Sequence, residues 1–264
     1  MMLKEIIEII ELTLDEDKRI LSPRAIFNEN YLLNLVMYWF MRQDHFIVNS
    51  DSDRKICKAF QLIGDDARCY NQATLETPFK VRNKGEKDPL AEASPTVSAV
   101  VGHFKVLYGK KKERITLLPE ANQFIIIETT LNKALNKGTR KFKNYNQVAR
   151  NISCMIQTIS HLDNIFLDHL GLYVVAPKKM LQQESFKTFT YKQSIDELIK
   201  KRVEDYGEDQ EKKAFLEIFN KIFQRIEVDC ISYEDILRFI KKNDNDYSEM
   251  INNFYKVCLR YHGL

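Results

Sequence analysis

The spacing of hydrophobic positions changes along the chain, and the first part has the period of helices. Apolar side chains recur at three- and four-residue intervals over residues 2–13, which predicts an amphipathic helix. Ser22 followed by Pro23 is typical of a helix start. The apolar run after it predicts a buried helix over 27–42, and a short helix is expected at 54–63.

The middle of the chain has the period of strands. Three prolines between residues 70 and 96 predict a long irregular excursion. β-rich segments follow it and predict a three-stranded meander at 97–107, 115–118 and 124–131. A helix is then expected at 144–160, and the continuous apolar run 170–177 is typical of a buried strand, as in parallel sheets.

The last part returns to the helical period. Ser194 and Ser232 each precede an acidic residue by three positions, which predicts capping boxes at two helix starts. The expected helices cover residues 194–206, 208–226, 232–242 and 246–260. We therefore expect an α/β core over 1–190, with a C-terminal helical annex over 191–264 packed on it.

Charge is concentrated in the middle of the chain, whose net charge is only +3. Residues 101–150 contain eleven lysines and arginines but three acidic residues. A basic centre on an acidic body favours a polyanion such as nucleic acid at one face. The alternative is two solvated lysine-rich loops, and we interpret the turn at 110–112 as a solvated hairpin tip. The candidate nucleic-acid-binding residues are Lys133, Lys137, Arg140, Lys141, Lys143 and Arg150.

Several function classes and compartments are disfavoured. The five cysteines form no Cys-x-x-Cys pair, which is typical of free thiols in a reducing compartment. The five histidines show no zinc-ligand spacing, and no apolar run reaches the length of a membrane span. The N-terminus is acidic and amphipathic, unlike a signal peptide, so a cytoplasmic protein is expected. Nucleotide-binding glycine loops and serine-nucleophile elbows are absent from the sequence.

One carboxylate, Glu128, stands inside the apolar strand predicted at 124–131. Alternate residues of a strand point to the same side, so Glu128 and Thr130 are expected to share one face. Strand carboxylates beside basic segments are typical of metal-dependent nucleases, because hard oxygen ligands suit Mg²⁺.

The order helix, three strands, helix, strand resembles the PD-(D/E)XK nuclease superfamily, with its restriction-endonuclease-like α/β core. Segments 117–128 (LLPEANQFIIIE) and 145–151 (YNQVARN) are similar to bacterial proteins with this fold, as are 90–92 (LAE) and 27–29 (FNE). The resemblance implies a Mg²⁺ cofactor, DNA as the partner, and a role in bacterial restriction or anti-phage defence. It also implies an Asp on the second strand, a Glu-x-Lys on the third, and Glu128 and Gln147 as catalytic residues.

Two of these expected positions are changed. The family Asp falls at Ser98 and the family Lys at Thr130, and a hydroxyl supplies neither a metal-binding charge nor an ammonium donor. Removal of one such group commonly costs about 10² to 10³ in rate, so we expect a nuclease fold with impaired catalysis. The alternatives are an active Mg²⁺-dependent endonuclease with relocated ligands, and a protein-interaction subunit that docks through the annex.

Relocation requires other acids or a migrated lysine. Glu29 is the strongest candidate for a second metal ligand, and Glu120 and Glu92 are further ones. The competing interpretations are structural. In the first, Glu128 forms an ion pair with Arg150. In the second, Glu29 only follows a helix cap, and in the third, Gln147 and Arg150 are surface residues of a helix.

Overall fold

The computed structural model describes residues 10–11, 13, 21–82, 88–109, 113–135, 138, 142, 145–207 and 210–264. The strands in this part of the chain are β1 (Arg68–Asn71), β2 (Ala99–Gly102), β3 (Phe104–Leu107), β4 (Arg114–Leu117), β5 (Gln123–Thr129), β6 (His169–Ala176) and β7 (Glu227–Ser232). The helices are α2 (Pro23–Ile26), α3 (Glu29–Phe40), α4 (Asp51–Phe60), α5 (Gln147–Ile159), α6 (Lys178–Leu181), α7 (Glu184–Thr190), α8 (Lys192–Tyr206), α9 (Gln210–Ile222), α10 (Tyr233–Asn243) and α11 (Asn245–His262). A 3₁₀ turn, Phe223–Arg225, follows α9.

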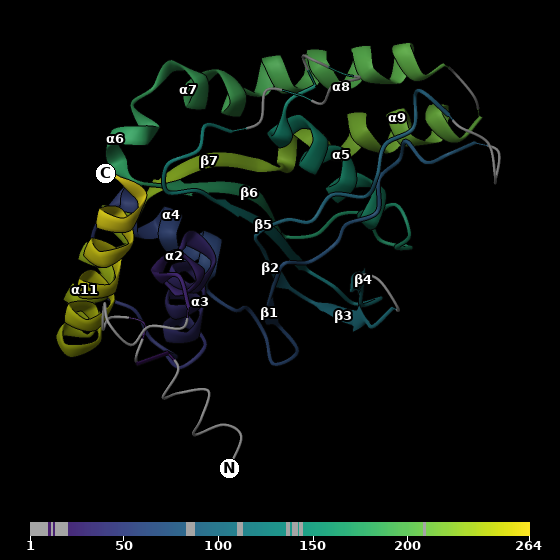
Figure 1. Ribbon diagram of the computed structural model, residues 1–264. Coiled ribbons are helices and arrows are strands. Elements are labelled where there is room, and N and C mark those ends of the chain that lie inside the picture. Colours follow the sequence, from purple (N-terminus) through teal and green to yellow (C-terminus); the bar gives the residue numbers. More distant parts are fainter. Residues whose placement is uncertain are drawn as a thin grey trace.

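Five strands form a mixed sheet in the order β1-β2-β5-β6-β7 (Figure 1). β1, β2 and β5 are antiparallel neighbours, whereas β5, β6 and β7 run parallel. Parallel neighbours need a crossover connection, and α5 supplies it between β5 and β6. The sheet is therefore an antiparallel meander joined to a parallel half at β5.

β5 is the central strand because its residues are apolar on both faces. Phe124 and Ile126 belong to the core on the α5 side, and Ile125 and Ile127 to the core on the other side. All four are essentially inaccessible to solvent. A strand of this kind is stable only with a helical layer on each face, since burial of a large apolar side chain contributes about 1.5–3 kcal/mol.

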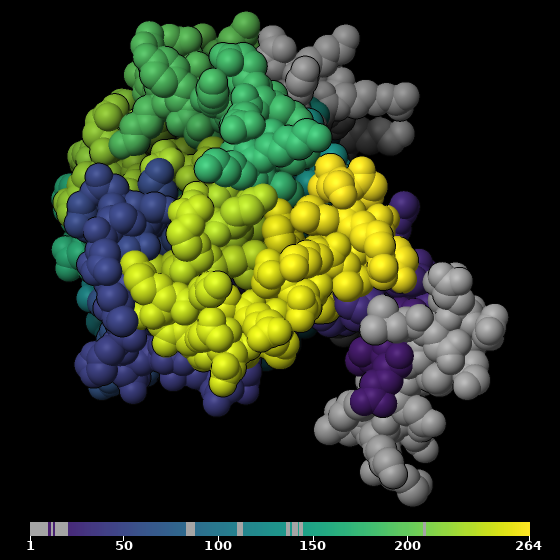
Figure 2. Space-filling view, turned by 90° about the vertical axis from the view of Figure 1, so that its left-hand side faces the viewer, coloured from purple at the N-terminus to yellow at the C-terminus, as the bar shows by residue number. Residues whose placement is uncertain are grey.

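The two helical layers combine distant parts of the chain. On one face α5 lies against the sheet and is covered by α8 and α9 (Figure 1). On the other face α3 and α4 pack with α10 and α11, and Figure 2 shows α11 in yellow at the surface of the molecule. Ten of the thirteen residues of α5 are buried, because it is enclosed between the sheet and the outer helices.

A buried arginine joins α8 to the irregular segment before β2. The Cζ atom of Arg202 lies 3.6 Å from the ring centre of Phe142 and 4.2 Å from that of Phe79. The guanidinium also donates to the carbonyl oxygen of Leu90. Burial lowers the pKa of Arg202, and the aromatic faces replace part of the lost hydration of the cation. This contact holds α8 against the α5 side of the core.

The expected helix over 27–42 forms with a different start. Pro23 opens the short helix α2, but the Ser22 side chain makes no capping hydrogen bond. α3 begins at Glu29 instead, where the side chain of Asn28 accepts hydrogen bonds from the backbone N–H groups of Asn30 and Tyr31. Most of the helix expected at 2–13 lies outside the described residues.

The antiparallel part of the sheet differs from the predicted meander, because only the segments at 97–107 and 124–131 contribute strands to it. Segment 97–107 is not one strand, because the chain turns at Gly102 and continues as β3. β3 pairs with β4 in a separate two-stranded sheet, so the segment at 115–118 is not part of the meander. Its place is taken by β1, which lies inside the stretch expected to be irregular.

The expectation of a purely helical annex over 191–264 is wrong in one respect. Residues Glu227–Ser232 form β7 and extend the sheet beside β6. The helices before β7 cover one face of the sheet and those after it cover the other. Ser232 caps α10 by accepting from the backbone N–H of Asp235, as predicted. α8 instead starts at Lys192 without a side-chain cap, so the box predicted at Ser194 is wrong.

No helix among the described residues is both long and apolar enough to cross a membrane.

Gly102 provides a test of the fold. Its φ of +141° is one that L side chains rarely adopt, and a Cβ there would lie 2.0 Å from the backbone oxygen of Gln123. We expect Gly102→Ala to lower the free energy of unfolding by more than about 3 kcal/mol, measured by urea denaturation. Gly263→Ala is the control, because its Cβ would meet nothing within 4 Å. Equal losses in the two variants would contradict the close approach at Gly102.

Candidate active site

Glu128 lies near the end of β5, next to a position of β2 predicted from the sequence. The antiparallel register pairs Ala99 with Ile127, which places Ser98 opposite Glu128. Alternation along β5 directs the Glu128 side chain to the same face as Ile126, toward α5. The two expected site positions, Ser98 just before β2 and Glu128 on β5, therefore meet.

Both carboxylate oxygens of Glu128 accept hydrogen bonds from uncharged side chains. The Ser98 hydroxyl donates to Oε2 at 3.0 Å, and the amide Nδ2 of Asn151 donates to Oε1 at 2.5 Å. The backbone N–H of Thr129 donates in turn to Ser98 Oγ at 3.1 Å. The carboxyl group is thus held between the meander and α5.

Burial controls the protonation of Glu128, which is 4% exposed. Loss of hydration raises the pKa of its carboxyl above the ordinary value of 4.5. Hydrogen bonds from Ser98, Asn151 and Gln147 oppose this rise without cancelling it. The site therefore favours the neutral carboxylic acid more than an exposed glutamate does.

A cavity of about 190 Å³ opens beside Glu128. Gln147, Arg150 and Asn151 reach it from the first turns of α5, so the structure brings the predicted residues Gln147 and Arg150 to Glu128. Asn146 starts this helix by accepting a hydrogen bond from the backbone N–H of Ala149. The remaining lining residues are Pro95, Thr96, Gly138 and Tyr145.

Arg150 pairs with a different carboxylate from the one considered in the sequence. Its Nε lies 3.4 Å from Glu92 Oε2, and its Nη2 donates to the carbonyl oxygen of Ala93 at 2.5 Å. Glu92 also accepts from the Thr77 hydroxyl at 2.7 Å. The expected alternative of a Glu128–Arg150 ion pair is therefore wrong, and Glu128 faces the cavity with neutral partners.

Thr130 lies just beyond the end of β5 and stabilises a turn. Its hydroxyl donates to the carbonyl oxygen of Lys133 at 2.9 Å and accepts from the Lys133 backbone N–H at 3.1 Å. The position expected for the family lysine is thus occupied by a turn-forming side chain. The side chain of Lys133 is exposed.

The structure does not bring the proposed metal ligands Glu29 and Glu120 to Glu128. Glu29 starts α3, which packs on the opposite face of the sheet, and its backbone oxygen accepts from Tyr233. Glu120 is exposed in the turn before β5, whereas Glu128 lies near the far end of that strand. At about 3.3 Å per residue, the strand alone separates them by more than about 16 Å. Lys137, Arg140, Lys141 and Lys143 lie outside the described residues.

Mg²⁺ does not fit the arrangement around Glu128. Among the described residues, no three histidine, cysteine or acidic side chains gather into a metal-binding group. The carboxyl of Glu128 is held by two hydrogen-bond donors, and burial raises its pKa, so its negative charge is less favourable than on an exposed glutamate. Mg²⁺ requires hard anionic oxygens, so the site as built does not supply them.

Asn151 is the site residue that sequence reasoning missed. It stands four residues after Gln147, so both occupy one face of α5. Its place on the apolar face of a predicted helix indicated a site residue, because a buried side-chain amide needs a hydrogen-bond partner.

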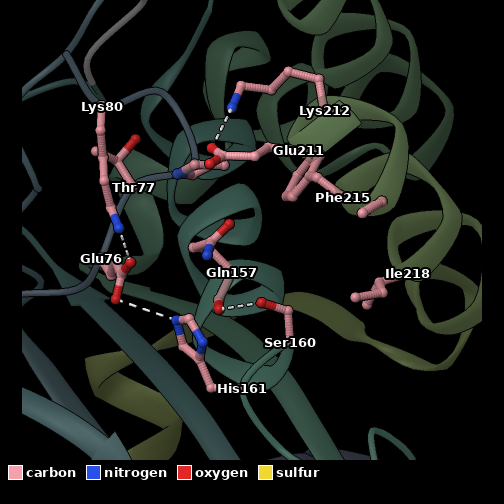
Figure 3. A pocket seen from close by; sticks show the side chains of 12 residues that line it. Glu76, Thr77, Lys80, Gln157, Ser160, His161, Glu211, Lys212, Phe215 and Ile218 are labelled. Atoms are coloured by element: carbon pink, nitrogen blue, oxygen red, sulfur yellow. Dashed lines mark hydrogen bonds and ion pairs between the residues drawn. The ribbon is translucent and has the colours of Figure 1, made fainter. Parts of the chain in front are cut away.

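A larger hollow of about 360 Å³ lies at the other end of α5 (Figure 3). Its charged side chains point to one another. Glu76 pairs with Lys80 and, at 3.3 Å, with His161, and Lys212 lies 3.9 Å from Glu211. Ten residues of helix separate its lining from Gln147, or roughly 15 Å. This hollow is separate from the Glu128 site.

Comparison of the chain with protein families, with curated proteins and with solved structures finds no match.

The raised pKa of Glu128 predicts a pH effect on stability. The stability due to its protonation is fully present below about pH 4.5 and is lost as the pH rises through the raised pKa. We expect the free energy of unfolding of Glu128→Gln to rise relative to wild type between about pH 4 and about pH 8.

Glu128→Ala is the matched control for this measurement. It leaves the Ser98 and Asn151 donors without their acceptor and should lose about 3 kcal/mol. A difference between wild type and Glu128→Gln that stays constant with pH would contradict the burial of a titrating carboxyl.

Proposed function

We propose that this chain is a nucleic-acid-binding protein with a PD-(D/E)XK-like nuclease fold and impaired catalysis. The observation that supports this most directly is the state of Glu128. Its carboxyl is hydrogen-bonded by Ser98 and Asn151, where a working site needs a second acid and a lysine. DNA is the proposed partner.

The order of the strands supports the proposed fold. The antiparallel strands β1, β2 and β5 are followed by α5 and by β6, which is parallel to β5. This is the sequence of elements that the resemblance implies. Ser98 also lies against Glu128, which is where the family Asp would have to stand to share a metal with it.

Impaired catalysis follows from the chemistry of these two positions. A serine hydroxyl contributes no negative charge to a metal site, and Thr130 contributes a turn instead of an ammonium group. Loss of two preorganised groups, each worth about 10² to 10³ in rate, leaves little hydrolysis above background.

The other two hypotheses receive less support. Relocated Mg²⁺ ligands require free acids near Glu128, but Glu29 and Glu120 lie elsewhere and Glu92 is engaged by Arg150 and Thr77. A docking annex requires an apolar patch on 194–264. In the described part of the annex, 191–264, the exposed large hydrophobic side chains are Tyr191, Met250 and Leu264, which lie before α8, within α11 and at the end of the chain.

Restoration of the family acid tests the assignment of Ser98. Ser98→Asp places a second carboxyl against Glu128, so the two should repel without metal and bind Mg²⁺ or Mn²⁺ together. We expect its melting temperature to fall without metal and to rise when metal is added. At one hundred times Kd the stabilisation is about 2.7 kcal/mol. Ser98→Asn, of similar size but uncharged, should show no metal response.

The same variant combined with Thr130→Lys tests catalysis. We expect wild type to leave DNA and RNA intact with Mg²⁺ or Mn²⁺, and the restored protein to cut, provided that Glu128 is present. Cleavage by wild type that is abolished in Glu128→Gln would contradict the proposal and support relocated ligands.

Binding should be dominated by phosphate contacts. The affinity of wild type for duplex DNA is expected to fall steeply as salt rises, measured by fluorescence anisotropy. Lys141→Glu with Lys143→Glu should weaken it further and reduce the salt slope by about 1 for each lysine. An affinity that does not change with salt would count against a nucleic-acid-binding face.

A further inference from the structure

The two-stranded sheet β3–β4 forms a ribbon with two different faces. Its register pairs Lys105 with Thr116 and Leu107 with Arg114. The inward side chains, including those of Phe104 and Ile115, are buried in the core on the α5 side. Because side chains alternate along each strand, the two cross-strand pairs just named form the outward face.

The outward face is exposed and combines apolar and basic groups. Lys105, Thr116 and Arg114 are all exposed, and Leu107 is 53% exposed. Tyr108, immediately after β3, is 77% exposed, the highest value among the large hydrophobic side chains that the structure describes. Large apolar groups beside cations on a projecting ribbon are typical of a contact surface.

The two cations of this face have no acidic partner in the described part of the chain. Neither Lys105 nor Arg114 forms an ion pair with any residue that the structure describes. The neighbouring acid, Glu113, instead accepts a hydrogen bond from the Tyr70 hydroxyl at 2.8 Å. In the sequence, the segment between the two strands adds three consecutive lysines at 110–112. The ribbon therefore combines two cations without an ion pair among the described residues with a lysine-rich connecting sequence, which suits a polyanion.

The ribbon is adjacent to the cavity at Glu128. Thr74 forms one β-bridge with Thr96, which lines that cavity, and another with Arg114 at the start of β4. Two strand spacings of about 4.8 Å place Arg114 roughly 10 Å from Thr96. Both lie on the α5 side of the sheet, so one extended ligand can contact the ribbon and the mouth of the cavity.

We propose that the outward face of the β3–β4 ribbon docks duplex DNA. The major groove of B-form DNA admits a two-stranded β-ribbon, whereas the deep, narrow major groove of duplex RNA does not. Lys105 and Arg114 contact phosphates, and Leu107 and Tyr108 contact base edges in the groove. This inference rests on the proposed nucleic-acid-binding function and names the surface and the ligand class.

A paired charge reversal tests the ribbon. Lys105→Glu with Arg114→Glu is compared with Lys241→Glu and Lys256→Glu, which change two exposed lysines on α10 and α11 across the sheet. Binding to fluorescent duplex DNA and to fluorescent single-stranded DNA is followed by anisotropy over a range of salt. We expect the ribbon variant to bind at least about tenfold more weakly than the control, with a salt slope smaller by about 2. Melting temperatures of both variants verify folding.

The possible results distinguish a failure of the ribbon assignment from a failure of the proposed nucleic-acid-binding function. If wild type binds and both variants lose affinity equally, the ribbon assignment is overturned while nucleic-acid binding stands. If the ribbon variant loses affinity only for single-stranded DNA, docking of duplex DNA is overturned. If wild type shows no salt-dependent affinity for any nucleic acid, the proposed function itself fails.

Discussion

The central strand β5 is the constraint on which the rest of the structure depends. Its apolar residues from Phe124 to Ile127 face both sides of the sheet, so neither side can be left to water. The chain meets this requirement with helices from both of its halves, and β7 returns from the C-terminal part to extend the sheet. The antiparallel pairing with β2 then fixes which residue stands beside Glu128.

Glu128 is an acid near the end of this buried strand, so its carboxyl is buried as well. Desolvation raises the pKa of its carboxyl, and the chain satisfies the group with donors from Ser98 and Asn151. Such a carboxyl joins the meander to α5 and needs no metal for its stability. Ser98 places a hydroxyl and no second negative charge beside this carboxyl.

The apolar pattern of the sequence predicts the buried central strands. It does not predict the edge strands or the side-chain contacts, which depend on residues distant in the sequence. β5 and β6 were predicted because their apolar runs are continuous, whereas β1 and β7 were missed because polar residues interrupt the short segments Arg68–Asn71 and Glu227–Ser232. The proximity of Ser98 to Glu128 was implied by the resemblance alone. Asn151 was missed because it belongs to no motif, and only its place on the apolar face of a predicted helix pointed to a buried partner. The position of Glu29 could not be predicted because it depends on which face of the sheet α3 covers.

Titration of Mg²⁺ and Mn²⁺ into the wild-type protein, followed by calorimetry beside Glu128→Gln, tests the account most directly. If Glu128 is a buried structural carboxyl, the two proteins should give the same heats and neither should show a saturable site that depends on residue 128. Saturable metal binding in wild type that disappears in Glu128→Gln would contradict the account. The acid would then be a metal ligand, with partners brought to it by a rearrangement of the site.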